Sequence, residues 1–147
     1  MTNETQKPIK QLEILFGDDQ FADASTRYFF QKDYAPMLQE RVPSIQFNWK
    51  YETSHEETIR EAQTGKYEVV VTDLNYTNGK EEGYEVVEKA CRVQPKPLVI
   101  LCTASNSPEL RTKAVDADYI ATSNERCFHK FDGLVEVLAK HFGGRTQ

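Results

Sequence analysis

The chain has no long apolar segment and few cysteines. No stretch of its 147 residues is apolar over a membrane-spanning length, and its first residues lack the apolar core of a secretion signal. The three cysteines, Cys91, Cys102 and Cys127, are an odd number without C-x-x-C spacing, which argues against a disulfide framework or a zinc site. We therefore expect a cytoplasmic protein that does not bind membranes.

Clustered positive charge is also missing. The chain has 18 Lys and Arg against 23 Asp and Glu, and the net charge is -5. Because nucleic-acid-binding domains carry basic patches, we expect no nucleic-acid partner. The content of 39% hydrophobic and 28% charged residues is ordinary for a globular protein, so we expect one domain over residues 1–147, with residues 1–9 as a flexible tail.

Short apolar segments with strand patterns alternate with helical segments. Strands are predicted at residues 10–16, 44–51, 98–103 and 119–122, and around the valine run 69–71 that ends at Asp73. Residues 44–51 alternate strictly between apolar and polar, which predicts an edge strand. Helices are predicted at 22–40, interrupted at Pro36, and at 56–64, 83–91, 107–115 and 133–142. This order predicts an α/β fold, a doubly wound five-stranded parallel sheet with helices on both faces.

Three of these strands end in acidic or hydroxyl residues, namely Asp18-Asp19, Asp73 and Thr103. In a parallel sheet all three ends lie on one rim, where open α/β sheets bind their ligands. Clustered carboxylates repel one another and need a cation, and hard oxygen ligands suit Mg²⁺. A carboxylate in such a site can also attack phosphorus and form an acyl phosphate. The pattern therefore favours a magnesium and phosphoryl site.

The same motifs, in this order and spacing, resemble those of response-regulator receiver domains, which have a flavodoxin-like fold. The matching segments are residues 14–19 (ILFGDD), 69–75 (VVVTDLN), 83–87 (GYEVV) and 99–104 (VILCTA). The resemblance extends from Leu12 to Phe142 and implies a stand-alone, somewhat divergent member of two-component signalling. It further implies that Asp73 accepts a phosphoryl group from a histidine kinase or a phosphotransfer protein.

The resemblance also assigns roles to other residues. Asp18, Asp19, Asp73 and the main-chain carbonyl of Asn75 would hold Mg²⁺. Thr103 would bind the phosphoryl oxygens, and Tyr119 resembles the rotating aromatic residue of the switch. Such a protein signals to a downstream protein partner through a surface change. It is not an enzyme beyond its own phosphorylation and dephosphorylation.

The family also has a lysine at the end of its last strand, where this chain has Thr122. Lys130 comes several residues later, and two hypotheses remain open. In the first, which we favour, a loop over residues 123–129 returns Lys130 to the crevice as the phosphoryl-binding lysine. In the second, residues 122–125 form a capping box, the last helix starts early and Lys130 lies on its surface. His129, beside Lys130, could help a phosphoryl site, but we favour a surface histidine.

Two alternative functions remain. The loop after Asp73 lacks the Met-Pro frequent in the family, and residues 33–43 are longer than usual, which fits a pseudo-receiver that binds partners without phosphorylation. Residues 71–77 also faintly resemble the D-x-D-x-T motif of haloacid-dehalogenase-like phosphatases. Asn75 stands where that family needs its second Asp, so this alternative is the weaker one.

Overall fold

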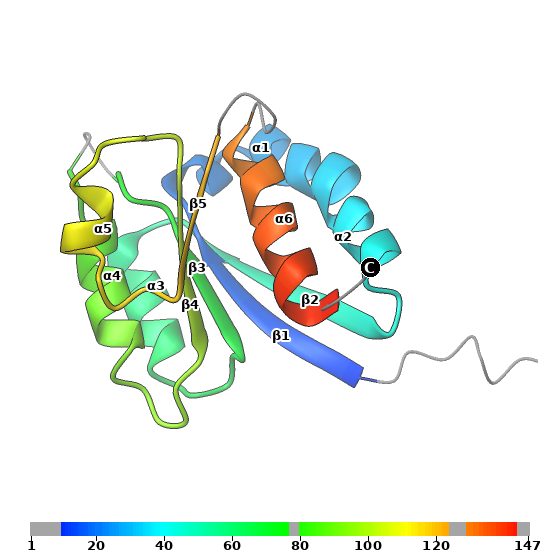
Figure 1. Cartoon of the computed structure of the whole chain (residues 1–147), viewed down its shortest axis with the longest axis horizontal. Helices are drawn as coiled ribbons and strands as arrows, with labels where there is room; N and C mark the ends of the chain where they lie inside the picture. The colour runs from blue at the N-terminus through cyan, green and yellow to red at the C-terminus, as the bar shows by residue number, and fades with distance from the viewer. Residues whose placement is uncertain (1–9, 77–79, 124–128, 144–147) are drawn as a thin grey trace, which may run out of the picture.

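A computed structural model of the chain describes residues 10–76, 80–123 and 129–143, so the tail predicted at residues 1–9 lies outside the described residues. The strands form one five-stranded, all-parallel sheet in the order β2-β1-β3-β4-β5 (Figure 1). The strands are β1 (Lys10–Gly17), β2 (Ile45–Glu52), β3 (Val69–Thr72), β4 (Leu98–Thr103) and β5 (Tyr119–Thr122). The predicted fold class is confirmed, and β2 lies at an edge, as its polar face indicates.

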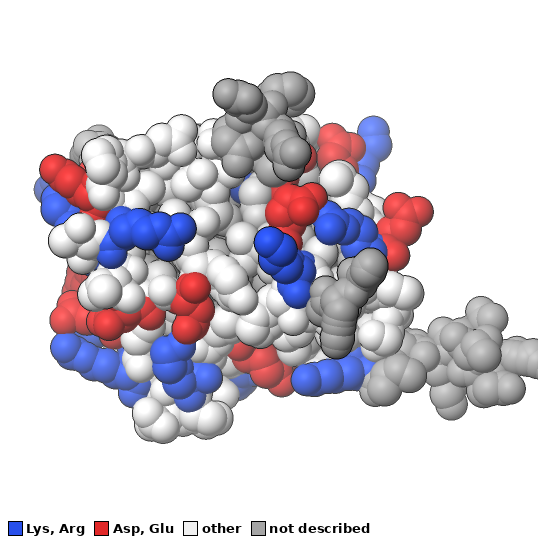
Figure 2. Space-filling view, viewed as in Figure 1, with Lys and Arg blue, Asp and Glu red and all other residues white. Residues whose placement is uncertain are grey.

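Helices cover both faces of the sheet (Figure 1). One layer contains α3 (His55–Ala62), α4 (Gly83–Ala90) and α5 (Leu110–Lys113). The other contains α1 (Ala24–Phe29), α2 (Ala35–Arg41) and α6 (Lys130–Gly143). None of the helices in the described ranges is long and apolar enough to span a bilayer. Acidic and basic side chains are interspersed on the face seen in Figure 2.

The strands supply a hydrophobic core on each side of the sheet. Leu12, Ile14 and Phe16 of β1 join the core beneath α6, whereas Leu15 faces the core beneath α3 and α4. The valines of β3, residues 69–71, are fully buried because this strand is central and covered on both faces. The buried strand ends at Thr72, and Asp73 follows it directly.

The connection between β1 and β2 is a broken helical segment, as predicted for residues 22–40 with an interruption at Pro36, but it has more pieces than one interruption gives. A 3-10 turn, η2 (Asp19–Ala22), comes first, and the π-helical turn η3 (Phe30–Tyr34) separates α1 from α2. Asp23 accepts a hydrogen bond from the Ser25 N–H at 2.9 Å and so starts α1 anew. Pro36 lies in the first turn of α2, where its missing N–H does least harm, and the widened turn comes just before it.

The cap of α3 lies where it is predicted, whereas the starts of α5 and α6 differ from the predicted ones. Ser54 caps α3 by accepting from the Glu57 N–H at 3.1 Å, as its capping-box spacing indicates. The helix predicted at 107–115 is only α5, one turn long, since serine side chains at 105 and 107 form turns of their own. The last helix begins three residues earlier than predicted, at Lys130. This early start decides where Lys130 lies.

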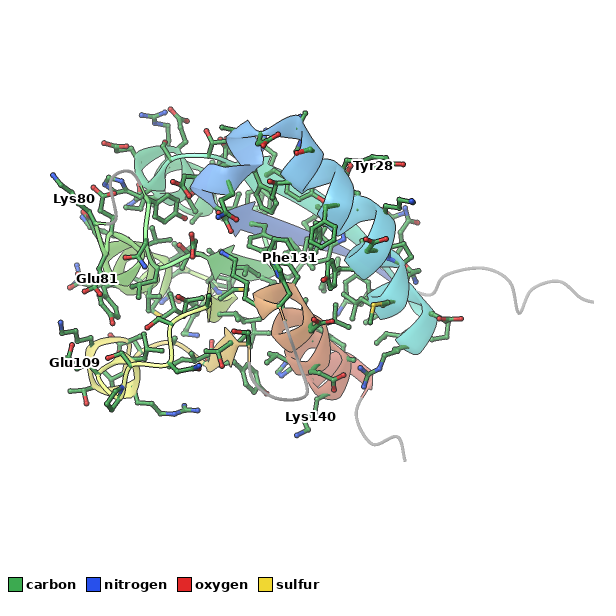
Figure 3. The ribbon with its side chains drawn as sticks, turned by 90° about the horizontal axis from the view of Figure 1, so that it is seen from above. Tyr28, Lys80, Glu81, Glu109, Phe131 and Lys140 are labelled. Carbon is green, nitrogen blue, oxygen red and sulfur yellow. The ribbon has the colours of Figure 1, made fainter. Side chains whose placement is uncertain are left out.

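An aromatic cluster fixes the N-terminal end of α6 against the sheet. The Phe131 ring lies 5.0 Å from Phe30 and 5.8 Å from Phe16, both edge-on, and stacks on Phe21 at 6.1 Å. Figure 3 shows Phe131 pointing inward from the start of α6, whereas Tyr28 points outward. Aromatic pairs of this kind add about 0.5–1.5 kcal/mol each beyond the area that they bury. The cluster therefore anchors the turn that carries Lys130.

Candidate functional site

Three strands deliver polar side chains to one rim of the sheet. Asp18 follows β1 directly, Asp73 follows β3, and Thr103 is the last residue of β4. All three are buried, with 0%, 7% and 1% of their surface exposed. Because the strands run parallel, their carboxyl ends meet, and this is the crevice where open α/β sheets bind ligands.

Asp18 is held by two contacts on opposite oxygens. Its Oδ1 accepts from the Gln20 N–H at 2.9 Å, which also caps the η2 turn. Its Oδ2 accepts from the ammonium group of Lys130 at 2.7 Å. The buried carboxylate is thus oriented by the backbone and neutralised by a cation.

Asp19 completes a group of three carboxylates. Oxygen atoms of Asp18, Asp19 and Asp73 all lie within 4.8 Å of one another. Burial, followed by repulsion from Asp18, raises the pKa of the Asp19 carboxyl. Negative charge is therefore crowded here, and a further cation would relieve it.

Asp73 is the most strongly perturbed acid of the group. Its Oδ1 accepts from the Leu74 N–H at 2.9 Å and lies 3.1 Å from the Lys130 Nζ. Burial raises the pKa of Asp73 to about 7, although Lys130 acts in the opposite direction. A carboxylate in this environment is poorly solvated, which is a property of groups that react or bind ions.

Lys130 reaches the crevice from the first residue of α6. It is 7% exposed and bridges Asp18 and Asp73. Burial acts to lower the pKa of Lys130, but attraction to Asp18 outweighs it and the pKa lies above its ordinary value. Of the two hypotheses, the one that leaves Lys130 on the helix surface is wrong. The capping box that it drew over residues 122–125 falls partly outside the described residues.

The other predicted site residues lie around this centre. The Thr103 Oγ1 accepts from the Ser105 N–H at 3.1 Å, which ties the hydroxyl to the loop after β4. Asn75 is half-buried, two residues beyond Asp73. The Tyr119 hydroxyl makes a 2.9 Å hydrogen bond with His141 Nδ1 on α6, so its ring lies at the outer side of β5.

Sequence reasoning missed two features of the site. Tyr76 is 2% exposed, and its hydroxyl lies 2.7 Å from the Thr72 Oγ1 beneath the crevice. No pattern in the loop sequence indicates that burial. His129 is half-buried, so its prediction as a surface histidine is wrong, and its imidazole caps α6. The adjacent Lys130-Phe131-Asp132 sequence could have indicated a helix start there.

A small hollow opens beside the cluster. It has a volume of about 160 Å³ and is lined by Gln20, Ala104, Ser123, His129 and Lys130. Residues from four different segments thus surround an opening next to the Lys130 ammonium group.

The donor set fits a divalent ion. Carboxylate oxygens are hard ligands, and Mg²⁺ is bound in proteins by one or a few of them while it keeps several waters. Asp18, Asp19 and Asp73 offer such oxygens within 4.8 Å of one another.

No protein-family model matches the chain, and no curated protein matches it significantly. Solved structures do. A response regulator receiver protein from Sinorhizobium medicae is 18% identical, with a TM-score of 0.65, over 92% of this chain and 98% of that one. The receiver domain of a sensor histidine kinase from Pseudomonas aeruginosa, with magnesium coordinated in its active-site cleft, is 13% identical, with a TM-score of 0.61, over 91% and 99%.

The response regulator TrrA from Thermotoga maritima, in complex with Mg²⁺-BeF, is 21% identical, with a TM-score of 0.58, over 86% of this chain and 98% of that one. These similarities extend over nearly the whole of each neighbour, and they agree with the strand order observed here. At such identities the likeness concerns the fold. The chain therefore has the fold of response-regulator receiver domains.

Proposed function

We propose that this protein is a response regulator of two-component signalling and that Asp73 accepts a phosphoryl group. The observation that carries the proposal is the meeting of Asp18, Asp19, Asp73 and Lys130 at one rim, with the lysine bridging two of the acids. A histidine kinase or a phosphotransfer protein would supply the group. A small hollow lined by Lys130 opens beside this group of side chains.

Both contacts of Asp73 described above fall on Oδ1, which leaves Oδ2 to attack phosphorus. The new bond joins Oδ2 to phosphorus while the bond from phosphorus to the donor's imidazole nitrogen breaks. The nitrogen keeps the electron pair, and the product is an acyl phosphate. Lys130 holds Asp73 in place and offers a positive charge to the phosphoryl oxygens.

Mg²⁺, when bound by Asp18, Asp19, Asp73 and the Asn75 carbonyl, would neutralise charge on the transferred group. Two proteins of this fold hold magnesium, TrrA as Mg²⁺-BeF and the Pseudomonas aeruginosa receiver domain in its active-site cleft, which supports this assignment. The product stays on the protein's own side chain. The proposed role is therefore that of a signalling domain and not of an enzyme that turns over a substrate.

The phosphoryl group would act on the loop after β4 through Thr103. At present the Thr103 Oγ1 accepts from Ser105, and its own hydroxyl hydrogen can be donated. Donation to a phosphoryl oxygen would draw this loop toward Asp73 and shift the surface formed by α5 and β5. Tyr119 lies on β5, so we assign it to the surface that responds and that a downstream protein partner reads.

The test is incubation with acetyl phosphate with and without Mg²⁺, followed by intact-mass measurement. We expect one phosphoryl adduct on the wild type with Mg²⁺, none on Asp73→Asn, and an unchanged adduct on the control Asp33→Asn, whose side chain is exposed on η3. No adduct on the wild type would contradict the proposal. A partner interaction insensitive to Asp73→Asn would then indicate a module that acts by binding alone.

A further inference from the structure

His129 forms an unusual cap at the start of α6. Its Nδ1 accepts from the Phe131 N–H at 3.1 Å, and the Asp132 carboxylate accepts from the His129 N–H at 3.0 Å. This reciprocal pair is the geometry of a capping box, with histidine in the place that Ser or Thr usually takes. Both hydrogen bonds enclose Lys130, the first residue of the helix.

The imidazole is also held from outside α6. Between ring centroids it lies 5.6 Å from Phe29 and 5.9 Å from Tyr34, and it lies 4.4 Å from Phe131 of α6 itself. The cap therefore joins α6 to the helical segment after β1. Burial and the neighbouring Lys130 lower the pKa of His129, which keeps Nδ1 free to accept.

The Lys130 ammonium group depends on this backbone. Its Nζ lies 2.7 Å from Asp18 and 3.1 Å from Asp73. Because the residue is only 7% exposed, its side chain has little room to adopt another conformation that keeps these contacts. A shift of the first helical turn would move the ammonium group away from both carboxylates. Phosphoryl-transfer geometry tolerates little displacement of a positioning group.

We propose that His129 is a positioning residue that, by capping α6, fixes the backbone from which Lys130 contacts Asp18 and Asp73. The inference rests on the proposed function only where it concerns phosphoryl transfer. Its structural part, the coupling between the cap and the lysine, is measurable without any phosphodonor.

Two matched variants separate the cap from the packing of the ring. His129→Asn keeps a side-chain acceptor at the cap but removes the ring, and His129→Phe keeps the ring but removes the acceptor. We expect acetyl phosphate with Mg²⁺ to phosphorylate the Phe variant about fivefold more slowly than the wild type, and the Asn variant within about twofold. Asp132→Ala, which removes the other half of the box, should slow the reaction in the same direction.

A binding measurement gives the second readout. When Lys130 withdraws, the carboxylates lose a positive charge, so the Phe variant should bind Mg²⁺ more tightly in calorimetry while it reacts more slowly. General destabilisation would not strengthen Mg²⁺ binding. Unchanged Mg²⁺ affinity and rate in the Phe variant, or equal losses in the Phe and Asn variants, would overturn the proposal. If the wild type accepts no phosphoryl group, the proposed function fails, while Mg²⁺ affinity still decides the role of His129.

Discussion

Lys130 and Asp18 form a buried ion pair between residues 112 positions apart in the chain, with 2.7 Å between Nζ and Oδ2. Asp18 is fully buried, and Lys130 is nearly so. Such a pair contributes little net stability when both charges are present, but the loss of one partner leaves the other buried and uncompensated. The pair thus ties the start of α6 to the end of β1 through the crevice.

Removing the lysine should destabilise the fold in a way that Mg²⁺ reverses. Lys130→Met leaves Asp18 and Asp73 without their cation, and we expect a loss of about 3 kcal/mol in urea unfolding without Mg²⁺. Mg²⁺ should restore more stability to this variant than to the wild type, because the ion then binds an uncompensated acidic group. Lys113→Met, at an exposed lysine paired with Glu109, is the control and should leave stability nearly unchanged. Equal losses in both variants would contradict this expectation.

Stability without Mg²⁺ should fall as the pH rises toward neutrality. The folded protein keeps the Asp73 proton up to a pKa of about 7, whereas an unperturbed Asp loses it near 3.8. Between these values the folded state binds more protons, so raising the pH favours the unfolded chain. Asp73→Asn removes this dependence and should be more stable than the wild type by on the order of 2 kcal/mol above pH 7, with the difference vanishing near pH 4. Urea unfolding in EDTA across this range measures it, with Asp33→Asn as the control. A stability difference between Asp73→Asn and the wild type that does not change with pH would contradict this prediction.

The sheet and the proximity of the acids can be predicted from the sequence because both follow from local patterns. Alternation and valine runs define strands, and alternating strands and helices define a parallel sheet. Once the sheet is parallel, Asp18 and Asp73 must end at one rim. No knowledge of side-chain packing is needed for that step.

Features that depend on packing between distant segments leave no local pattern. The location of Lys130 is set by the path of the chain after β5 and by the Phe131 cluster, so only the resemblance to receiver domains favoured its return to the crevice. The interruption of the helix between β1 and β2 is indicated by Pro36, but the 3-10 turn η2 and the π-helical turn η3 are not. His129 could not be identified as a cap because histidine is rarely used there.

The start of α4 lies so close to the segment after β3 that no side chain should be tolerated at Gly83. A Cβ there would overlap the Asp73 carbonyl oxygen and the Leu74 backbone, which cannot move without disturbing the crevice. We expect Gly83→Ala to destabilise the protein by about 2 kcal/mol and to slow phosphorylation of Asp73. Gly143→Ala is the matched control, since its Cβ would meet only Val42 at 3.6 Å and the Arg41 carbonyl at 4.0 Å. Thermal unfolding of both variants would test the difference, and a neutral Gly83→Ala would contradict the packing argument.

Substitution of Thr103 should separate the phosphorylation of Asp73 from the change that it causes in the surface formed by α5 and β5. Thr103→Val keeps the shape of the side chain but loses the hydroxyl that accepts from Ser105 and that would donate to the phosphoryl group. Phosphorylation by acetyl phosphate should slow by no more than about tenfold relative to the wild type, because a single neutral hydrogen bond contributes only about 0.5–1.5 kcal/mol. Phosphorylation of the wild type should shift the backbone amide signals of Ser105 and Tyr119, and these shifts should be much smaller in this variant. Thr103→Ser keeps the hydroxyl and should behave as the wild type does. Full shifts in the Val variant would mean that the change travels from Asp73 to β5 by another route, since the hydroxyl is the only group that this substitution removes.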